Sequence, residues 1–237
     1  MAPNAKGRKM ISLVSVLVGL ALLAFVLRIF ARRKRRVALG IDDYLCFVAN
    51  TLMVGMLIEL VIWCAIGGNG YHQSDLDAQT LQTFYKIFLS NQFTYFVLTP
   101  TVKISFVCFY RRVFTTSKFH RVTFALNCLM ATWSAGIFLS CALQCRPLRA
   151  YWDRSIDGHC FNGDLFIIVN QGFNVAMDFI ILLLPIPMIW SLQRSWQDKL
   201  ALNGVFAVGG FVCFASIYRI VVLFYIDPKD TTYESFS

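Results

Sequence analysis

The sequence predicts an all-α fold, a polytopic bundle of transmembrane helices. Six stretches of about 20 mainly apolar residues, the length with which a helix crosses hydrocarbon about 30 Å thick, make up most of the 237 residues. Hydrophobic residues account for 57% of the chain and charged residues for 15%, against about 45 to 50% and about 25% in soluble domains. The apolar runs are continuous rather than alternating, which excludes barrel strands, and an open sheet cannot satisfy its edges in lipid.

The first apolar run covers residues 10–30 and follows a basic N-tail, an arrangement that secretory signals share. A cleavable signal has an apolar region of about 7 to 15 residues and a cleavage site of small residues. This run is longer and ends in a basic block. We therefore expect an uncleaved first span after a short external tail at 1–9, followed by the block Arg32, Arg33, Lys34, Arg35 and Arg36.

The later runs are separated by charged or Gly-rich turns, and all six form one predicted transmembrane domain over 10–226. An external tail or truncated loop follows at 227–237. A seventh span is expected to be missing, although a complete six-span protein is the open alternative. The predicted spans are 10–30, 44–66, 84–110, 122–143, 166–190 and 202–226.

The distribution of Lys and Arg predicts the orientation. The turns after the first, third and fifth spans carry eleven basic residues, including Arg111 and Arg112, and the opposite side carries seven. The positive-inside rule places the N-terminus outside, although the basic N-tail opposes this assignment. The net charge is +9, and five of the 22 basic residues form the block directly after the first span, which suits anionic headgroups or a cytoplasmic partner rather than nucleic acid.

Two cysteines, Cys145 and Cys160, flank a turn that this topology places outside. An oxidising exterior favours a disulfide between them, and closing 15 residues contributes about 3 kcal/mol in the chain-entropy estimate. The bridge would hold Trp152 and Asp153 over the helix ends, whereas two unpaired thiols are the alternative. The other six cysteines are expected to be packing residues, and no spacing predicts a metal site.

Three polar residues at i, i+4 and i+8 share one face of the fifth predicted span: Asn170, Asn174 and Asp178. Asp178 lies about 18 Å along the helix from residue 166. Charged groups at that depth cost about 2.5 to 3.5 kcal/mol on insertion scales, so this face should turn toward other helices or a wet cavity. Both interhelical hydrogen bonding and a ligand or ion site fit the pattern.

Other charged residues lie within predicted spans, namely Glu59, Lys103 and Arg219. Lys103 and Arg219 have stems long enough to reach headgroups, whereas the shorter Glu59 needs a partner. We expect Asp178 or Glu59 to pair with Lys103 or Arg219 across the bundle.

Prolines and one external loop complete the candidate features. Pro100, and Pro185 with Pro187, each remove a backbone donor and favour a kink. His72, in the Gly-rich second turn, belongs either to a solvated loop or to a proton-sensitive external surface.

Together these residues resemble the fungal rhodopsin-domain integral membrane proteins, a family of seven-span receptor-like proteins. The matching features are Asp42-Asp43-Tyr44, Gly68-x-Gly70-x-His72, Lys103-Ile-Ser105, Phe109-Tyr110-Arg111-Arg112, Cys145-x-Pro147, Trp152, Cys160, Asn174-x-x-x-Asp178, Pro185, Gly210 and Arg219. The resemblance implies a plasma-membrane protein with receptor-like topology that senses external cues. The sequence departs from the family pattern in two respects. The seventh span of the family is expected to be missing, and no cysteine-rich module precedes the first span.

The leading functional prediction is a receptor-like protein that binds an unknown external ligand and engages a cytoplasmic signalling protein. A small-molecule or ion transporter or channel is the alternative, because a polar stripe beside kinked helices also suits a substrate path. No catalytic motif predicts an enzyme. No cofactor is expected: retinal attachment needs a buried lysine, the fifth and sixth spans hold none, and Lys86 and Lys103 lie toward the two ends of the third.

Overall fold

Within the described part of the chain, five helices are long and apolar enough to cross a membrane, which confirms the predicted all-α transmembrane class. The computed structural model describes residues 5–68, 77–153, 156–161, 163–190, 209–218 and 221. In chain order the helices are α1 (Ala5–Lys34), α2 (Ile41–Ile66), α3 (Ala78–Val113), α4 (Ser117–Ala142) and α5 (Gly163–Leu183). A short α6 (Ile186–Trp190) continues α5, and a further apolar helical segment covers Gly209–Tyr218.

The ends of α5 and α6 follow from proline chemistry. The predicted fifth span runs to residue 190, whereas α5 ends at Leu183 and α6 begins at Ile186. Pro185 has no N–H to donate and its ring clashes with the preceding turn, so the helix is interrupted there. Of the predicted sixth span, 202–226, the structure describes only 209–218 and 221, and Arg219 and His72 both lie outside the described residues.

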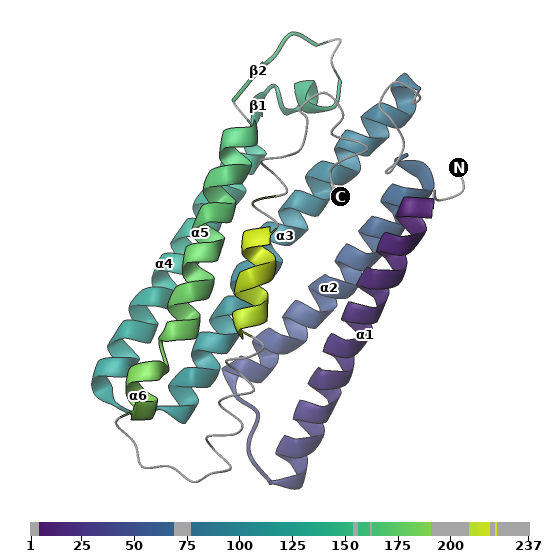
Figure 1. Cartoon of the computed structure of the whole chain (residues 1–237). Coiled ribbons are helices and arrows are strands. Elements are labelled where there is room, and N and C mark those ends of the chain that lie inside the picture. Colours follow the sequence, from purple (N-terminus) through teal and green to yellow (C-terminus); the bar gives the residue numbers. More distant parts are fainter. Residues whose placement is uncertain are drawn as a thin grey trace.

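The helices run along a common direction, and α3 is central (Figure 1). It packs against α2, α4 and α5, while α1 contacts α2. Apolar side chains of α3, α4 and α5 form the largest core cluster, which includes Val107, Met130 and Met177. The beginning of α1 lies at the same end of the bundle as β1 (Cys145–Arg146) and β2 (His159–Cys160).

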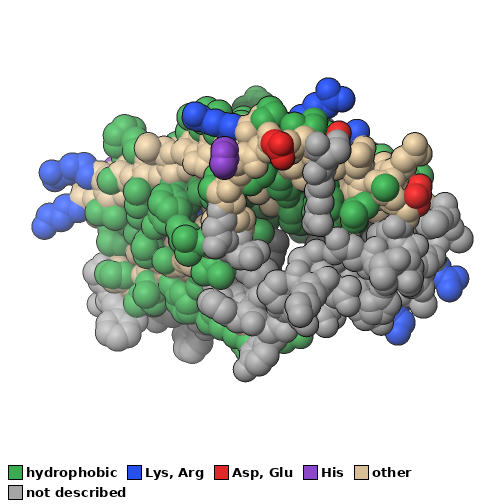
Figure 2. Space-filling view, turned by 90° about the horizontal axis from the view of Figure 1, so that it is seen from above, with side chains coloured by type: hydrophobic (Ala, Val, Ile, Leu, Met, Phe, Trp, Pro, Cys, Tyr) green, Lys and Arg blue, Asp and Glu red, His purple; other side chains and the backbone are tan. Residues whose placement is uncertain are grey.

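The outer faces of the bundle are apolar. Large hydrophobic side chains on α1 are largely exposed, among them Leu13 at 63% and Phe30 at 64%. Figure 2, a view onto one end of the bundle, shows hydrophobic side chains beside the Lys, Arg, Asp, Glu and His side chains of that end. Soluble proteins rarely expose such continuous apolar surface, whereas lipid tails solvate it without cost. The protein is therefore a multi-pass membrane protein.

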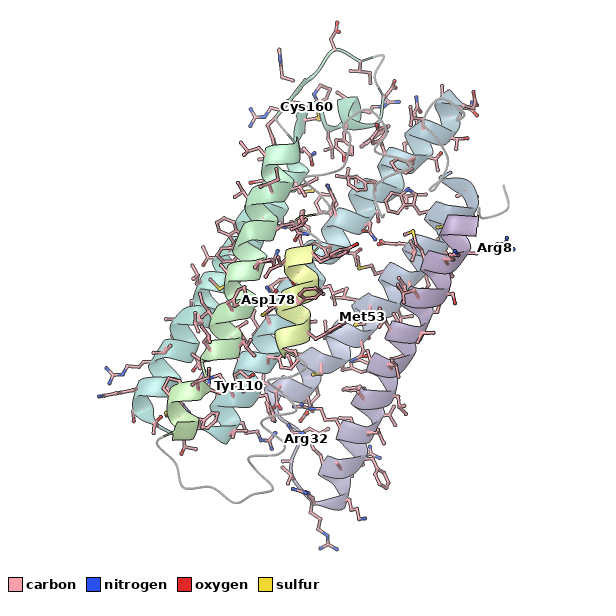
Figure 3. The ribbon with its side chains drawn as sticks, in the orientation of Figure 1. Arg8, Arg32, Met53, Tyr110, Cys160 and Asp178 are labelled. Atoms are coloured by element: carbon pink, nitrogen blue, oxygen red, sulfur yellow. A yellow bond between two sulfur atoms is a disulfide. The ribbon has the colours of Figure 1, made fainter. Side chains whose placement is uncertain are left out.

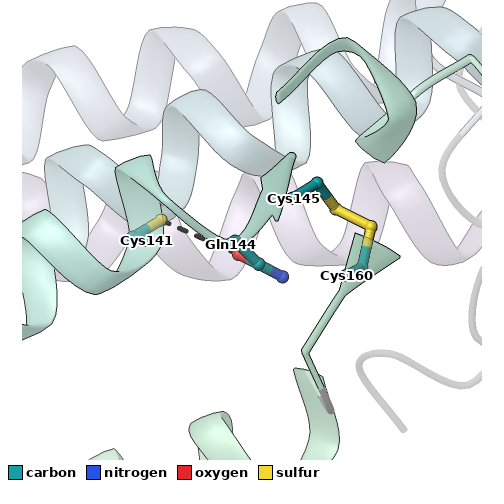
Figure 4. Close-up of a disulfide and its surroundings, with 4 residues drawn as sticks. All are labelled: Cys141, Gln144, Cys145 and Cys160. Atoms are coloured by element: carbon teal, nitrogen blue, oxygen red, sulfur yellow. Dashed lines mark hydrogen bonds between the residues drawn. A yellow bond between two sulfur atoms is a disulfide. The ribbon is translucent and has the colours of Figure 1, made fainter. Parts of the chain in front are cut away.

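A disulfide-closed hairpin covers one end of the bundle. Strands β1 and β2 pair antiparallel with Cys145 opposite Cys160, and the two cysteines form the predicted disulfide with Cα atoms 4.1 Å apart (Figure 4). The enclosed loop begins with a cis Arg146–Pro147 peptide and a 3₁₀ turn, Leu148–Tyr151.

Side chains from this loop pack onto α3. Leu148, Tyr151 and Trp152 contact the cluster that contains Leu89 and Phe96. The ammonium of Lys86 lies 5.8 Å from the ring centroid of Trp152. Burial of Tyr151 raises the pKa of its hydroxyl above the ordinary value. The hairpin is thus fixed over the end of α3.

Candidate functional site

An ion pair between α3 and α5 forms the centre of the candidate site. Lys103 Nζ lies 3.0 Å from Asp178 Oδ1, and the exposed fractions of the two side chains are 11% and 14%. Lys103 also donates to the backbone carbonyl of Asn174 at 2.6 Å. Ser216, in the segment Gly209–Tyr218, donates to Asp178 Oδ2 at 3.1 Å. The pair therefore connects three helices.

This network lies about midway along the bundle. Figure 3 shows Asp178 near the middle of the long axis, with Cys160 at one end and Arg32 at the other. A charge at that depth is stable only when it is paired and hydrogen-bonded. The three contacts to Asp178 and Lys103 meet that requirement.

The remaining members of the polar stripe connect α5 to α4. Asn174 donates to the Asn170 carbonyl at 3.0 Å, and Asn170 Oδ1 accepts from the Trp133 indole N–H at 3.5 Å. Trp133 stacks on Phe173 with ring centroids 4.0 Å apart. The stripe thus divides: Asn170 contacts α4, whereas Asp178 faces α3.

A cavity of about 720 Å³ adjoins the ion pair. Its volume is within the range of about 300 to 1,000 Å³ that small-molecule sites occupy. The cavity lies between α3, α5 and the segment Gly209–Tyr218. Apolar groups predominate in its lining, and the polar members are Tyr95, Thr99, Lys103, Tyr110, Gln171, Asn174, Asp178 and Ser216.

Glu59 forms a separate polar cluster between α2 and α3. Its Oε1 accepts from Ser90 at 2.8 Å and from Thr94 at 3.0 Å, and its Oε2 accepts from Asn91 at 3.5 Å. No salt bridge to Glu59 forms among the residues that the structure describes. Within that part of the chain, hydroxyl and amide donors rather than a cation contact this carboxylate.

The proline within α3 has a replacement donor on α4. Pro100 lacks an N–H, so the carbonyl of Phe96, four residues earlier, loses its helical partner. Ser134 Oγ donates to that carbonyl at 2.9 Å. The bond joins α3 to α4 at the same depth as the candidate site, because Pro100 and Ser134 both line a small cavity beside Lys103.

A second ion network lies at the opposite end from the disulfide. Arg28 and Arg32 of α1 each contact both Asp42 and Asp43 at the start of α2, at distances of 2.5 to 2.9 Å. Arg112 of α3 approaches the same carboxylates at 3.4 and 3.7 Å. The two aspartates are 2 to 3% exposed, so the three guanidinium groups replace the water that the carboxylates have lost.

Some residues of the predicted basic surface belong to this network, and others remain exposed. Arg32 and Arg112 contribute to ion pairs that join helices, and Arg112 also donates to the Ala38 carbonyl at 2.7 Å. Four basic residues remain exposed around the turn between α1 and α2: Arg33, Lys34, Arg35 and Arg36. Arg111 is partly buried.

Several participants were not singled out from the sequence. Arg28 is a charge within the predicted first span, and its partners Asp42 and Asp43 were noted only as part of a family pattern. One sequence signal could have indicated this network: two carboxylates, Asp42 and Asp43, stand at the start of an apolar helix and closely follow a basic block. Ser216, Trp133, Tyr95 and Gln171 gave no such signal, because a single polar residue in an apolar run has no periodicity.

The order of these features along the chain agrees with a known family. Residues 27–237 match the fungal rhodopsin domain. The chain belongs to the fungal rhodopsin-domain family. This match covers every helix described above except the first part of α1.

Curated relatives of the chain are fungal proteins. A SAT4 family membrane protein of Emericella nidulans is 35% identical over 70% of this chain and 45% of its own length. Receptor GIN3 of Arthrobotrys oligospora is 25% identical over 84% of this chain and 48% of its own length. Wortmanamides biosynthesis cluster protein C of Talaromyces wortmannii is 27% identical over 86% of this chain and 58% of its own length. The chain thus spans about half the length of these relatives, and no solved structure matches it.

Proposed function

We propose that this fungal rhodopsin-domain protein is a receptor in which a ligand in the 720 Å³ cavity changes the packing of α3 against α5. The observation that carries this proposal is the Lys103–Asp178 ion pair, because it joins two helices, contacts a third through Ser216 and lines the cavity. A ligand shifts a conformational equilibrium only through differential contacts with its two states. Groups that connect helices and also line the cavity supply such contacts.

Helix α3 offers a physical route from the cavity to the basic end. It carries both Lys103 and Arg112, nine residues or about 14 Å apart along its axis. Arg112 contacts Asp42 and Asp43, which also hold α1. A displacement of α3 would therefore alter the ion pairs at both positions, and in this proposal α3 is the two-state element.

The proposed orientation places the disulfide end outside the cell. Disulfides persist in oxidising compartments, which favours an extracellular position for Cys145 and Cys160 and for the beginning of α1 at the same end. The exposed residues Arg33 to Arg36 would then lie in the cytoplasm, as the positive-inside rule requires. The proposed location is the plasma membrane.

Those four exposed basic residues would bind either anionic headgroups or an acidic surface of a cytoplasmic signalling protein. The name of the GIN3 relative, a receptor, agrees with the proposal, whereas the biosynthesis-cluster names state no activity.

We propose neither catalysis nor a retinal cofactor for this chain. Lys103, the lysine that lines the cavity, already contacts the carboxylate of Asp178 and donates to the Asn174 carbonyl, so we assign it to the contacts between helices rather than to a covalent cofactor. Among the residues that the structure describes, no group of His, Cys, Asp or Glu is arranged to hold a metal ion.

The test is guanine-nucleotide exchange on a fungal heterotrimeric G protein, with the full chain reconstituted in lipid nanodiscs. Asp178→Asn, which releases Lys103, is expected to raise ligand-independent exchange several-fold over the unsubstituted protein. Ser216→Ala is a milder second variant should Asp178→Asn fail to fold. Gly172→Ala on the same helix is the matched control, because nothing lies within 4 Å of its added methyl group. Exchange no greater than with empty nanodiscs, for every variant, would reject the receptor proposal.

A transporter is the second candidate, favoured by the position of a charged pair beside a cavity at mid-depth. Proton or potassium flux into proteoliposomes that Asp178→Asn abolishes would select this alternative. Flux equal to that of empty liposomes would reject it.

A further inference from the structure

Resting on the proposed receptor function, we infer that the cavity between α3, α5 and Gly209–Tyr218 binds an uncharged, largely apolar small molecule with one hydrogen-bonding head group, taken up from the lipid. The inference concerns the chemical class of the ligand and its route. Three features of the cavity support it: the charge of its polar groups, the position of those groups and the nature of its rim.

The two charged groups in the described lining of the cavity neutralise one another. The single cation, Lys103, is paired with the single anion, Asp178, among the described lining residues. Tyr95 donates to Gln171 at 3.1 Å. An ionic ligand would bring an uncompensated charge into a site of low dielectric, and it would have to break the ion pair to find a partner.

The same groups can still recognise a neutral head. Lys103 has three N–H donors, and the described residues engage two of them, one toward Asp178 and one toward the Asn174 carbonyl. The carboxylate of Asp178 has further acceptor positions beyond those used by Lys103 and Ser216. A hydroxyl, carbonyl or amide group can donate to or accept from these positions without separating the pair.

The remainder of the cavity is suited to hydrocarbon. Val102 and Val175 line its walls, and two apolar side chains of its lining, Phe106 and Val212, are 48% and 45% exposed. Asp178 lies near mid-depth of the bundle, where the surroundings of a membrane-spanning helix are hydrocarbon rather than water. A ligand dissolved in the bilayer could therefore reach the cavity laterally.

The experiment compares photoaffinity probes on the full chain in nanodiscs. Four probes share a sixteen-carbon chain with a diazirine at its centre, and they end in a hydroxyl, a sulfate, a trimethylammonium or a methyl group. The hydroxyl probe is expected to label peptides that contain Val102–Tyr110 or Val175–Leu182 saturably, with competition by unlabelled hexadecanol. Labelling by the two ionic probes should require about tenfold higher concentration or more, and the methyl probe should label more weakly than the hydroxyl probe.

Two cavity-filling variants and one matched control assign the labelling to the cavity. Val175→Trp fills the cavity and should reduce saturable labelling several-fold, and Val102→Trp provides the same test from α3. Val169→Trp is the control, because Val169 lies on the same helix, is 49% exposed and lines neither cavity. Thermal unfolding of each variant establishes that it is folded.

Equal labelling by an ionic probe, labelling that does not saturate, or equal effects of Val175→Trp and Val169→Trp would overturn the inference. The probe comparison needs no variant, so it remains decisive even if the two cavity-filling variants, Val175→Trp and Val102→Trp, unfold. Nucleotide exchange is measured without probe. Saturable labelling without exchange would therefore reject the receptor proposal alone, whereas exchange in Asp178→Asn without selective labelling would reject the ligand class alone.

Discussion

At the scale of single residues, the position of each charge within the bundle decides its partner. Lys103 and Asp178 face each other between two helices and neutralise one another. Glu59 faces a polar surface of α3 and is satisfied by three uncharged donors. In both cases the carboxylate is kept in its site by hydrogen bonds that water would otherwise supply.

Removing one partner of the central pair should be more harmful than removing both. Lys103→Met or Asp178→Leu alone leaves an unpaired charge within the bundle, and we expect a loss of about 3 to 5 kcal/mol in the free energy of unfolding. The double variant should recover most of that loss. A double-mutant cycle from thermal or denaturant unfolding in detergent measures the coupling. Additive losses would show that the pair is not formed.

Glu59 should tolerate an amide better than an apolar side chain. Glu59→Gln keeps an acceptor oxygen for Ser90 and Thr94, whereas Glu59→Leu leaves their hydroxyls and the Asn91 amide without this acceptor. We expect the leucine variant to be about 1 to 3 kcal/mol less stable than the glutamine variant. Unfolding midpoints in the same detergent provide the comparison, and equal midpoints would contradict the described cluster.

At the scale of elements, α3 organises the bundle because it contacts α2, α4 and α5. Its proline would leave a carbonyl unpaired in lipid, where each such group is costly. Ser134 of α4 supplies the donor to the Phe96 carbonyl. The missing hydrogen bond at Pro100 thus favours this particular contact between α3 and α4.

This relation predicts a background-dependent effect of Ser134→Ala. In the natural sequence the substitution removes the donor to the Phe96 carbonyl and should cost about 1 kcal/mol. In a Pro100→Ala background the restored N–H of residue 100 bonds that carbonyl, so Ser134→Ala should be nearly neutral. Unfolding of the four proteins measures both values. The same cost in both backgrounds would mean that Ser134 stabilises the protein by other contacts.

At the scale of the whole molecule, the two ends of the bundle differ in chemistry. One end carries the disulfide hairpin, and the other carries the network of Arg28, Arg32, Asp42 and Asp43 beside exposed basic residues. This asymmetry is what a protein needs when its ends face an oxidising exterior and a membrane leaflet rich in anionic lipid.

Accessibility labelling tests the proposed orientation. A membrane-impermeant maleimide applied to intact cells should label Asp157→Cys, in the hairpin, but should not label Lys34→Cys, at the end of α1. Permeabilised cells should allow labelling of both, which serves as the control. Labelling of Lys34→Cys alone in intact cells would invert the topology.

Much of the helical architecture could be predicted from the sequence, because lipid requires long apolar helices whatever their arrangement. The interruption near Pro185 likewise follows from a local property of proline. The disulfide could be predicted only with the topology, since spacing alone does not place both cysteines outside. The choice of Lys103 for Asp178, the role of Arg28 and the contribution of Ser216 could not be predicted.

The sequence by itself determined that this is a multi-pass helical membrane protein and that the few charges in its spans need partners. Those conclusions depend on residue types and on periodicity within one helix, which are local. Only the tertiary structure decided which charges meet, because Lys103 and Asp178 lie on helices whose rotation and depth are set by packing along their whole length. For the same physical reason, the cavity beside them emerged only when the three helices were placed together.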